Sequence, residues 1–420
     1  MYSVIKTQSV MVGLGLIVFS GQVWADLSLD QAVRASLGYS AEIQAQEANY
    51  HSDQAAERAA GTLPDPRLYS GVSNLPVSSM GGVNALSTGQ DPMSMQVIGI
   101  TQDLPNSAKR HAEHDLVEAH VEQDAVSVAK ARVDLRIQTA QAWIQRYYTE
   151  KRIGLLKEQQ DDSRLLIALV NQQIAAGRRP ASDAIDAQLD DADLNNQLDS
   201  MQGKLMGSQA QLVRLVGERG HEPLLGTIPA WPINRGDLFH QLAHHPDLML
   251  AQTSLKSAEA GVATAEADRH PDWGMDLAYQ HRGPAYADMI SLTVSMSLPV
   301  FQGSRQGPRI MAQQERLANA RDTLLDMQRE HAAALESDIS TWESLQGQVM
   351  RMQHDVLPWS QKKIELLLVN YQAGTADINS LLAARSQRRR LILERIDLSE
   401  QQAMLAARLH YQCDTMEVQP

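Results

Sequence analysis

The sequence predicts a mainly α-helical protein with a small β part, in which one order of segments occurs twice. Residues 106–176 contain no proline and a single glycine, which favours one very long helix. Residues 290–298 alternate strictly between apolar and hydroxyl side chains, which is typical of a strand. The third observation is recurrence: Leu-Pro and Ala-Gly pairs follow the strands and long helices of both halves, at Leu104, Ala176, Leu298 and Ala373.

Composition and charge narrow the classes of protein that the chain can be. Only 5% of the 420 residues are aromatic, with three Phe, which favours helices that meet along narrow seams over an ordinary globular core. A formal net charge of −13 argues against nucleic acid as a partner. After the first 25 residues no apolar run is long enough for a transmembrane helix, so any membrane insertion must use strands.

The N-terminal segment is predicted to be a removable secretory signal peptide, residues 1–25. Lys6 precedes a short apolar run from Val10 to Phe19, and Val23-Trp24-Ala25 resembles a cleavage site. At the other end we expect a short tail, 412–420, with the single cysteine Cys413, which cannot form an internal disulfide.

The first repeat is predicted to span 26–216. We expect one helix from Leu27 to Ala60, then two strands and a long helix that turns back at a glycine. The return helix carries apolar residues at heptad spacing, which predicts an antiparallel helical hairpin. The expected strands are 67–75 and 95–102, and the expected hairpin tip is 177–180.

The second repeat is predicted to span 237–411, after a Gly- and Pro-rich linker at 217–236. It should begin with a helix from Leu242 to Ala267. Pro358 interrupts the second long helical run and should kink it. The expected strands are 273–281 and 290–298, and the expected tip is 374–376.

The strand 290–298 has no charge on either face. Small hydroxyls opposite aliphatics suit a strand between lipid and a water-filled lumen, although a strand packed on a helical core fits the alternation too. The matching strand of the first repeat ends in the same Leu-Pro and favours the membrane interpretation. We expect Leu292, Val294, Met296 and Leu298 to face lipid, and Ser291, Thr293, Ser295 and Ser297 to face the lumen.

Four strands per chain cannot close a membrane barrel by themselves, since at least eight are needed. Two chains would give a barrel filled by side chains, whereas three would give twelve strands and a lumen. The geometry therefore favours a homotrimer, with the long helices extending the barrel as a helical tube about 100 Å long.

The duplicated order, with Leu-Pro after the second strand and Ala-Gly at each tip, resembles the TolC-type outer-membrane efflux proteins. The segments 63–67, 74–76 and 93–102 are similar to the heavy-metal efflux branch, which includes CusC and CzcC. The resemblance implies a duct in the outer membrane with a periplasmic tunnel. Its implied partners are a periplasmic adaptor and an inner-membrane pump of the resistance-nodulation-division type. Asp26 stands where many relatives carry an acylated cysteine, so no lipid anchor is expected.

The expected function is passive conduction of exported substrate, with heavy-metal cations as the expected cargo. An alternative is the same duct for organic drugs or other small molecules. A periplasmic adaptor would need one hairpin rather than two, and a secreted coiled-coil structural protein would have no use for uncharged strands.

The tips carry the candidate site residues. Asp183 and Asp186 lie one turn apart after the tip glycine and could form a carboxylate gate, with Asp377 as the nearest acid in the second hairpin. Helix capping is the alternative role for such acids. The resemblance implies adaptor docking at Gly177, Arg178, Gly374 and Thr375.

Catalytic and metal sites are not expected. The chain has no phosphate-binding loop and no nucleophile elbow, so we predict that it is not an enzyme and needs no cofactor. His111, His114 and Glu118 share a helix face, but a solvated face is the simpler interpretation. Met80, Met93, Met95 and Met275 near the strands are expected to fill apolar space.

Overall fold

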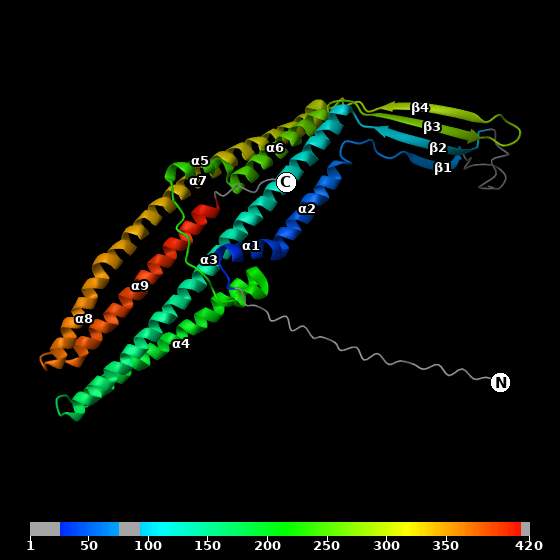
Figure 1. Cartoon of the computed structure of the whole chain (residues 1–420). Coiled ribbons are helices and arrows are strands. Elements are labelled where there is room, and N and C mark those ends of the chain that lie inside the picture. Colours follow the sequence, from blue (N-terminus) through cyan, green and yellow to red (C-terminus); the bar gives the residue numbers. More distant parts are fainter. Residues whose placement is uncertain (1–25, 75–92, 413–420) are drawn as a thin grey trace, which may run out of the picture.

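The structure, a computed structural model, describes residues 26–74 and 93–412. It is elongated, with a β-sheet at one end and two helical hairpin tips at the other (Figure 1). The predicted signal peptide, most of the loop between the first two strands with Met80, and the tail with Cys413 lie outside the described residues.

The strands form one antiparallel sheet in the order β1-β2-β3-β4. Each half of the chain contributes a hairpin, and the two hairpins pair through β2 and β3, from Gln96 opposite His281 to Leu104 opposite Trp273. The bounds are β1 Arg67–Ser73, β2 Met95–Leu104, β3 Trp273–His281 and β4 Met289–Met296.

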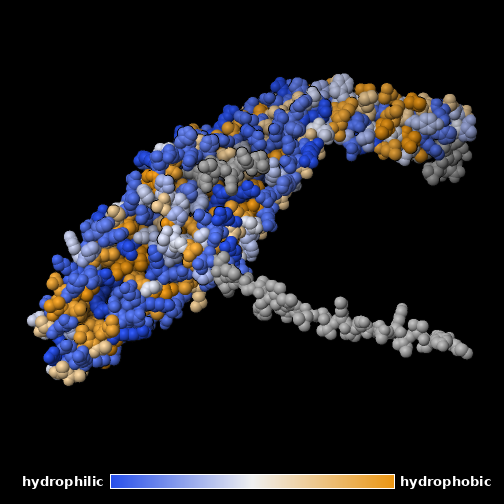
Figure 2. All heavy atoms as spheres, viewed as in Figure 1, coloured by the Kyte–Doolittle hydropathy of each residue, from blue (hydrophilic) through white to orange (hydrophobic). Residues whose placement is uncertain are grey.

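The strand register sorts side chains onto two different faces, because successive residues of a strand point to opposite sides. Aliphatic and aromatic residues of β3 and β4 oppose each other on one face, where Leu277 pairs with Leu292 and Met275 with Val294. On the other face, Thr293 pairs with Asp276. Figure 2 shows hydrophobic residues gathered over this end of the molecule.

β4 is shorter than predicted and ends at Met296. The backbone N–H of Ser297 donates to the Asp272 carbonyl at 2.8 Å, and the Asp272 N–H donates to the Ser297 hydroxyl at 2.8 Å. Ser297 therefore closes the end of the ladder, and both Ser297 and Leu298 lie beyond the strand in which they were predicted.

The first hairpin consists of α3, Ser107–Ala175, and α4, Ser182–Val216. α3 has 69 residues, which corresponds to about 100 Å. It begins where the Asn106 side chain accepts from the Lys109 N–H at 2.8 Å. The same side chain donates to Asp272 at 2.9 Å, so the start of α3 is bonded to the second half of the chain.

The second hairpin contains the expected interruption near Pro358. α7 ends at Arg351, a π-helical turn covers Met352–Val356, and α8 begins at Leu357 with Pro358 in its first turn. Proline cannot donate a helical hydrogen bond, and the wider turn before it accommodates the loss. The bounds are α7 Gly307–Arg351, α8 Leu357–Gln372 and α9 Ile378–Tyr411.

The prediction of one helix from Leu27 to Ala60 is wrong. The structure has α1, Leu29–Tyr39, and α2, Ala41–Glu57, separated at Ser40. Ser40 has an extended backbone, and its hydroxyl accepts from the Ile43 N–H at 3.3 Å. A serine that can cap a new helix therefore ends the preceding one.

The start of the second repeat also differs from the prediction. α5 covers Arg235–Gln241, so it begins inside the end of the expected linker and precedes the expected helix start at Leu242, and a short 3₁₀ turn follows at Leu242–His244. α6 then runs over Pro246–Ala267. His245 caps α6 and Pro246 occupies its first turn, a position that suits proline.

The largest apolar core lies where α1, α3, α4 and α9 meet, around the fully buried Trp143. The Trp143 indole N–H donates to the Leu27 carbonyl at 3.0 Å, which fixes the chain just before α1. Among the described residues, no helix combines the length and the apolar character that a membrane span requires.

Candidate functional site

Both hairpin tips end their first helix in the same way. Gly177 and Gly374 have φ values of +70° and +81°, a region that glycine enters without steric cost. The next residue, Arg178 or Thr375, donates its N–H at 2.9 Å to the carbonyl five residues earlier. These are the bonds of a Schellman motif, and they leave both glycines facing open space.

The two tips are bonded to each other through Tyr371, which is 1% exposed. Its hydroxyl donates to the Asp183 carboxylate at 3.3 Å. The Arg179 guanidinium lies 4.1 Å from the centre of the Tyr371 ring and donates to the carbonyls of Tyr371 and Ala376 at 2.6 and 2.8 Å. We call Arg179, Asp183 and Tyr371 the tip cluster.

Tyr371 of the tip cluster is surrounded by buried apolar side chains and lies next to a carboxylate. Tyr371 belongs to a buried group contributed by α3, α8 and α9: Leu166, Val170, Tyr371, Ile378, Leu381 and Leu382. Burial and the Asp183 carboxylate raise the pKa of Tyr371, so the phenol remains a hydrogen-bond donor at neutral pH.

The three predicted gate acids lie in different environments. Asp183 is 6% exposed, whereas Asp186 is half-buried and Asp377 is exposed. Asp377 caps α9, because its carboxylate accepts from the Ser380 N–H at 2.8 Å. Hydrogen bonds from Ser380 lower the pKa of Asp377. The tip cluster was not predicted, since Tyr371 and Asp183 are 188 residues apart in sequence.

The docking residues predicted from the resemblance are exposed at the ends of the hairpins. Gly177, Arg178, Gly374 and Thr375 all lie on the surface. The Thr375 hydroxyl donates to the Asn370 carbonyl at 3.0 Å and so reinforces its own turn.

The apolar face of the sheet is exposed in the single chain. Ile290 and Leu292 expose 75% and 64% of their surface, and neighbouring strands add Leu68, Ile98, Ile100, Leu277 and Tyr279 to the same face. A contiguous exposed surface of this kind indicates contact with lipid or protein. Within the described residues, β1 and β4 each pair on one side only, which leaves two open edges.

The polar face of the sheet is crossed by one side chain. Tyr69 of β1 reaches over Gly99 of β2, and its hydroxyl donates to Asp276 of β3 at 3.0 Å. A Cβ atom at Gly99 would lie 2.5 Å from the Tyr69 ring. Glycine is therefore required at this position by the aromatic ring above it.

Of the candidate metal ligands from the sequence, His114 and Glu118 form an exposed group with Asp115 on α3, and His111 is not part of it. His111 bonds the Ser107 carbonyl, and His114 lies 3.8 Å from Glu118 on an exposed face of α3. Met95 and Met275 lie on opposite faces of the sheet, as their positions in the register require.

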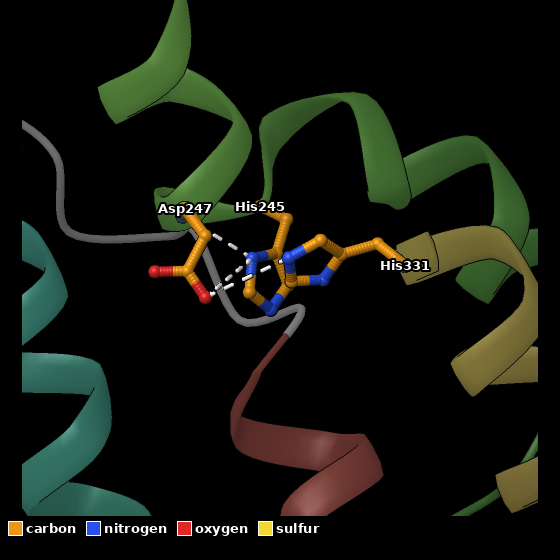
Figure 3. Close-up of side chains that lie close together, drawn as sticks. All are labelled: His245, Asp247 and His331. Carbon is orange, nitrogen blue, oxygen red and sulfur yellow. Dashed lines mark hydrogen bonds and ion pairs between the residues drawn. The ribbon is translucent and has the colours of Figure 1, made fainter. Parts of the chain in front are cut away.

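A different group comes together at the start of α6, where no metal ligands were predicted from the sequence. His245, Asp247 and His331 lie close together, the last from α7 (Figure 3). Burial and the neighbouring His331 lower the pKa of His245. Although burial opposes it, the bond from Lys130 lowers the pKa of Asp247.

Comparison with known proteins shows which proteins the chain resembles. Residues 240–410 match the family described as outer membrane efflux protein. This match covers most of the second half of the chain. The cobalt-zinc-cadmium resistance protein CzcC of Cupriavidus metallidurans is 21% identical over 384 residues, which cover 88% of this chain and 85% of CzcC.

Solved structures of low sequence identity share the fold. A structure of CusC has a TM-score of 0.79 at 14% identity and covers 92% of each chain. A membrane protein from Pseudomonas aeruginosa has a TM-score of 0.80 at 15% identity, with 93% of this chain and 92% of that chain covered. VceC from Vibrio cholerae has a TM-score of 0.76 at 17% identity, with 91% and 95% covered.

These matches confirm the resemblance to outer-membrane efflux proteins, including the heavy-metal efflux branch, and the mainly helical fold with a small antiparallel sheet. The matched family consists of efflux proteins and not enzymes, which agrees with the lack of catalytic motifs in the sequence. At such low identities the solved structures establish the fold alone.

Proposed function

We propose that the chain is the outer-membrane exit duct of a tripartite efflux system and conducts substrate passively. The observation that carries the proposal is the sheet, with one apolar exposed face, one polar face and two open edges. Lipid would cover the apolar face, whereas the polar face would line a water-filled lumen. Similarity to the outer membrane efflux protein family supports this location in the cell.

Three copies complete the proposed barrel. Open strand edges are not tolerated in lipid, so β4 of one chain would pair with β1 of the next. Three chains of four strands make twelve, enough for a lumen. Because β1 to β4 alternate in direction, the joint between chains would also be antiparallel. The helical hairpins would continue the duct as an α-barrel in the periplasm.

The proposed organisation of the chain follows from this arrangement. Each of the two repeats, 26–216 and 237–411, would supply one strand hairpin and one helical hairpin to the trimer. The exposed tip turns at Gly177 and Gly374 would receive a periplasmic adaptor, which connects the duct to an inner-membrane pump of the resistance-nodulation-division type. Backbone without a Cβ at these glycines allows close approach of a partner.

Membrane fractionation and gel analysis test the duct. The protein should be found in the outer-membrane fraction, resist extraction with carbonate and run as a trimer in SDS without boiling. A mature protein that stays soluble without detergent would rule out the duct and favour an adaptor or a secreted structural protein.

Heavy-metal cations are the proposed cargo, supported by the similarity to a cobalt-zinc-cadmium resistance protein. Deletion of the gene should sensitise cells to one or more of cobalt, zinc, cadmium, copper and silver, and expression of the chain should restore growth. Sensitivity to organic drugs or dyes alone would reject the metal cargo and leave the duct intact.

A further inference from the structure

His245, Asp247 and His331 form a compact group that the duct does not require. The Asp247 carboxylate oxygen Oδ2 lies 3.8 Å from His245 Nδ1 and 3.8 Å from His331 Nε2. The two imidazole rings are 4.4 Å apart between centroids. Figure 3 shows the two rings lying against each other with the carboxylate beside them, His245 and Asp247 from the start of α6 and His331 from α7.

We propose that these three side chains bind one divalent transition-metal ion of the kind that accepts imidazole nitrogen and carboxylate oxygen, such as Zn²⁺ or Co²⁺. Two histidines and one carboxylate leave at least one position for water, as in exchangeable sites. In a tetrahedral site with bonds of about 2.0 Å, neighbouring ligand atoms are roughly 3.3 Å apart. The two observed 3.8 Å separations therefore need a closure of about 0.5 Å, and all three ligand atoms lie within 4.8 Å of one another.

The charges around the group suit a cation that binds reversibly. Lys130 of α3 bonds the other oxygen of Asp247, Oδ1, at 2.8 Å and also Asp134 at 3.0 Å. Two carboxylates against one ammonium leave one net negative charge when both histidines are neutral. Oδ2 remains on the side of the histidines, but the nearby ammonium should weaken cation binding.

Burial separates this group from the exposed cluster on α3. The side chains of His245, Asp247 and His331 expose 15%, 28% and 23% of their surface. His114 and Glu118 expose 47% and 55%, and both belong to one helix. The proposed ligands come from two elements, so a bound ion would bridge the start of α6 to the middle of α7. His114 thus provides a matched control.

One hydrogen bond must adapt when the ion binds through His245 Nδ1. This nitrogen accepts from the Asp247 backbone N–H at 3.2 Å, a long bond that caps α6. Coordination would replace the cap, whereas His331 has no such capping role in α6. His331→Gln is therefore the cleaner substitution.

Binding of Co²⁺ and Zn²⁺ to the purified, tag-free trimer in detergent tests the site. We expect one ion per chain by calorimetry, and visible Co²⁺ absorption that Zn²⁺ abolishes by displacement. Loss even of a residue outside the ligand set weakens metal sites 10- to 100-fold, so His331→Gln should weaken binding roughly 100-fold or more. Lys130→Met should strengthen it about tenfold, because a competing cation is removed.

His114→Gln should leave the binding unchanged. Circular dichroism and trimer formation on gels confirm that each variant is folded, and the opposite direction of the Lys130 effect excludes general damage. Absence of stoichiometric binding in the wild type, or binding that His331→Gln leaves intact, would overturn the site. Metal binding is measured without reference to the cargo of the duct. The experiment therefore distinguishes a duct for organic molecules that has a metal site from a duct for metal ions that has none.

Discussion

At the scale of single residues, the tip cluster contains a buried acid that forms a hydrogen bond between the two hairpins. Asp183 lies in the first hairpin and accepts a hydrogen bond from Tyr371 of the second. A buried carboxylate that loses a donor costs about 1–3 kcal/mol. We infer that Asp183 holds the tips together in this conformation, and that Asp186 is the more accessible acid for a carboxylate ring.

Removal of the Tyr371 hydroxyl should loosen the tips. Tyr371→Phe keeps the ring under Arg179 but removes the donor to Asp183, so we expect a larger open probability and higher mean conductance in planar bilayers. Asp183→Asn should act in the same direction and, together with Asp186→Asn, should also reduce cation selectivity.

Asp377→Asn is the control for the tip substitutions. Asparagine caps helices as well as aspartate, so this change removes a tip charge without removing the cap of α9. If Asp377→Asn opened the channel as much as Tyr371→Phe, net charge and not the hydrogen bond would govern closure. Unchanged conductance in Tyr371→Phe would show that the hydrogen bond between Tyr371 and Asp183 does not hold the tips closed.

At the scale of elements, the strands carry the clearest relation between sequence and environment. Adjacent residues of β4 lie on opposite faces of the sheet. Substitutions at two adjacent positions therefore compare the two faces at nearly the same depth in the proposed bilayer. Val294 pairs with Met275 on the apolar face, and Thr293 pairs with Asp276 on the polar face.

Val294→Arg should impair assembly, whereas Thr293→Arg should not. An arginine on the lipid face near the middle of the bilayer costs about 2–4 kcal/mol, while one in a lumen is solvated. The measurement is the yield of outer-membrane trimer for the two variants. Equal yields, or a lower yield for Thr293→Arg, would contradict the assigned faces.

Sequence patterns predicted the helices and strands whose limits are set by residues that are neighbours in the sequence. Period-two alternation located β4, and absence of proline together with a following glycine located α3 and its end at Ala175, two residues before Gly177. The break at Ser40 was not predicted because apolar residues occur on both sides of it, Leu37 before and Ile43 after, whereas the break itself is the extended backbone of Ser40, whose hydroxyl caps α2. Contacts such as Tyr371 with Asp183, or His331 with His245, depend on packing between distant helices and have no signature in the sequence.

At the scale of the whole molecule, the sheet of the single chain leaves surfaces that a further partner or lipid could cover. Its sheet has an apolar surface without a covering element among the described residues and two edges with unpaired backbone groups. Pairing between copies would satisfy the edges, and lipid would cover the surface. The barrel, the tunnel and the tip contacts would then all depend on one trimer.

Cysteine pairs can test whether β1 and β4 of different chains are neighbours. In a Cys413→Ser background, Gly71→Cys on β1 can be combined in turn with Ser291→Cys, Thr293→Cys or Ser295→Cys on β4. All four positions lie on the polar face, and a side chain at Gly71 meets open space. Paired strands lie about 4.8 Å apart, within reach of a disulfide at the correct register.

Oxidation of membranes should give linked dimers and trimers for at least one of these pairs. Gly71→Cys combined with Ala278→Cys should give none, because Ala278 lies on the inner strand β3 and pairs with Gly99 and Ser291 of its own chain. Monomers alone across the whole β4 series would mean that the edges are closed in another way and would reject the shared twelve-stranded barrel. Disulfides to β4 but not to β3 would show that β4 of one chain lies beside β1 of the next and would give the register between them. The register then identifies the lumen-facing residues where the two chains meet.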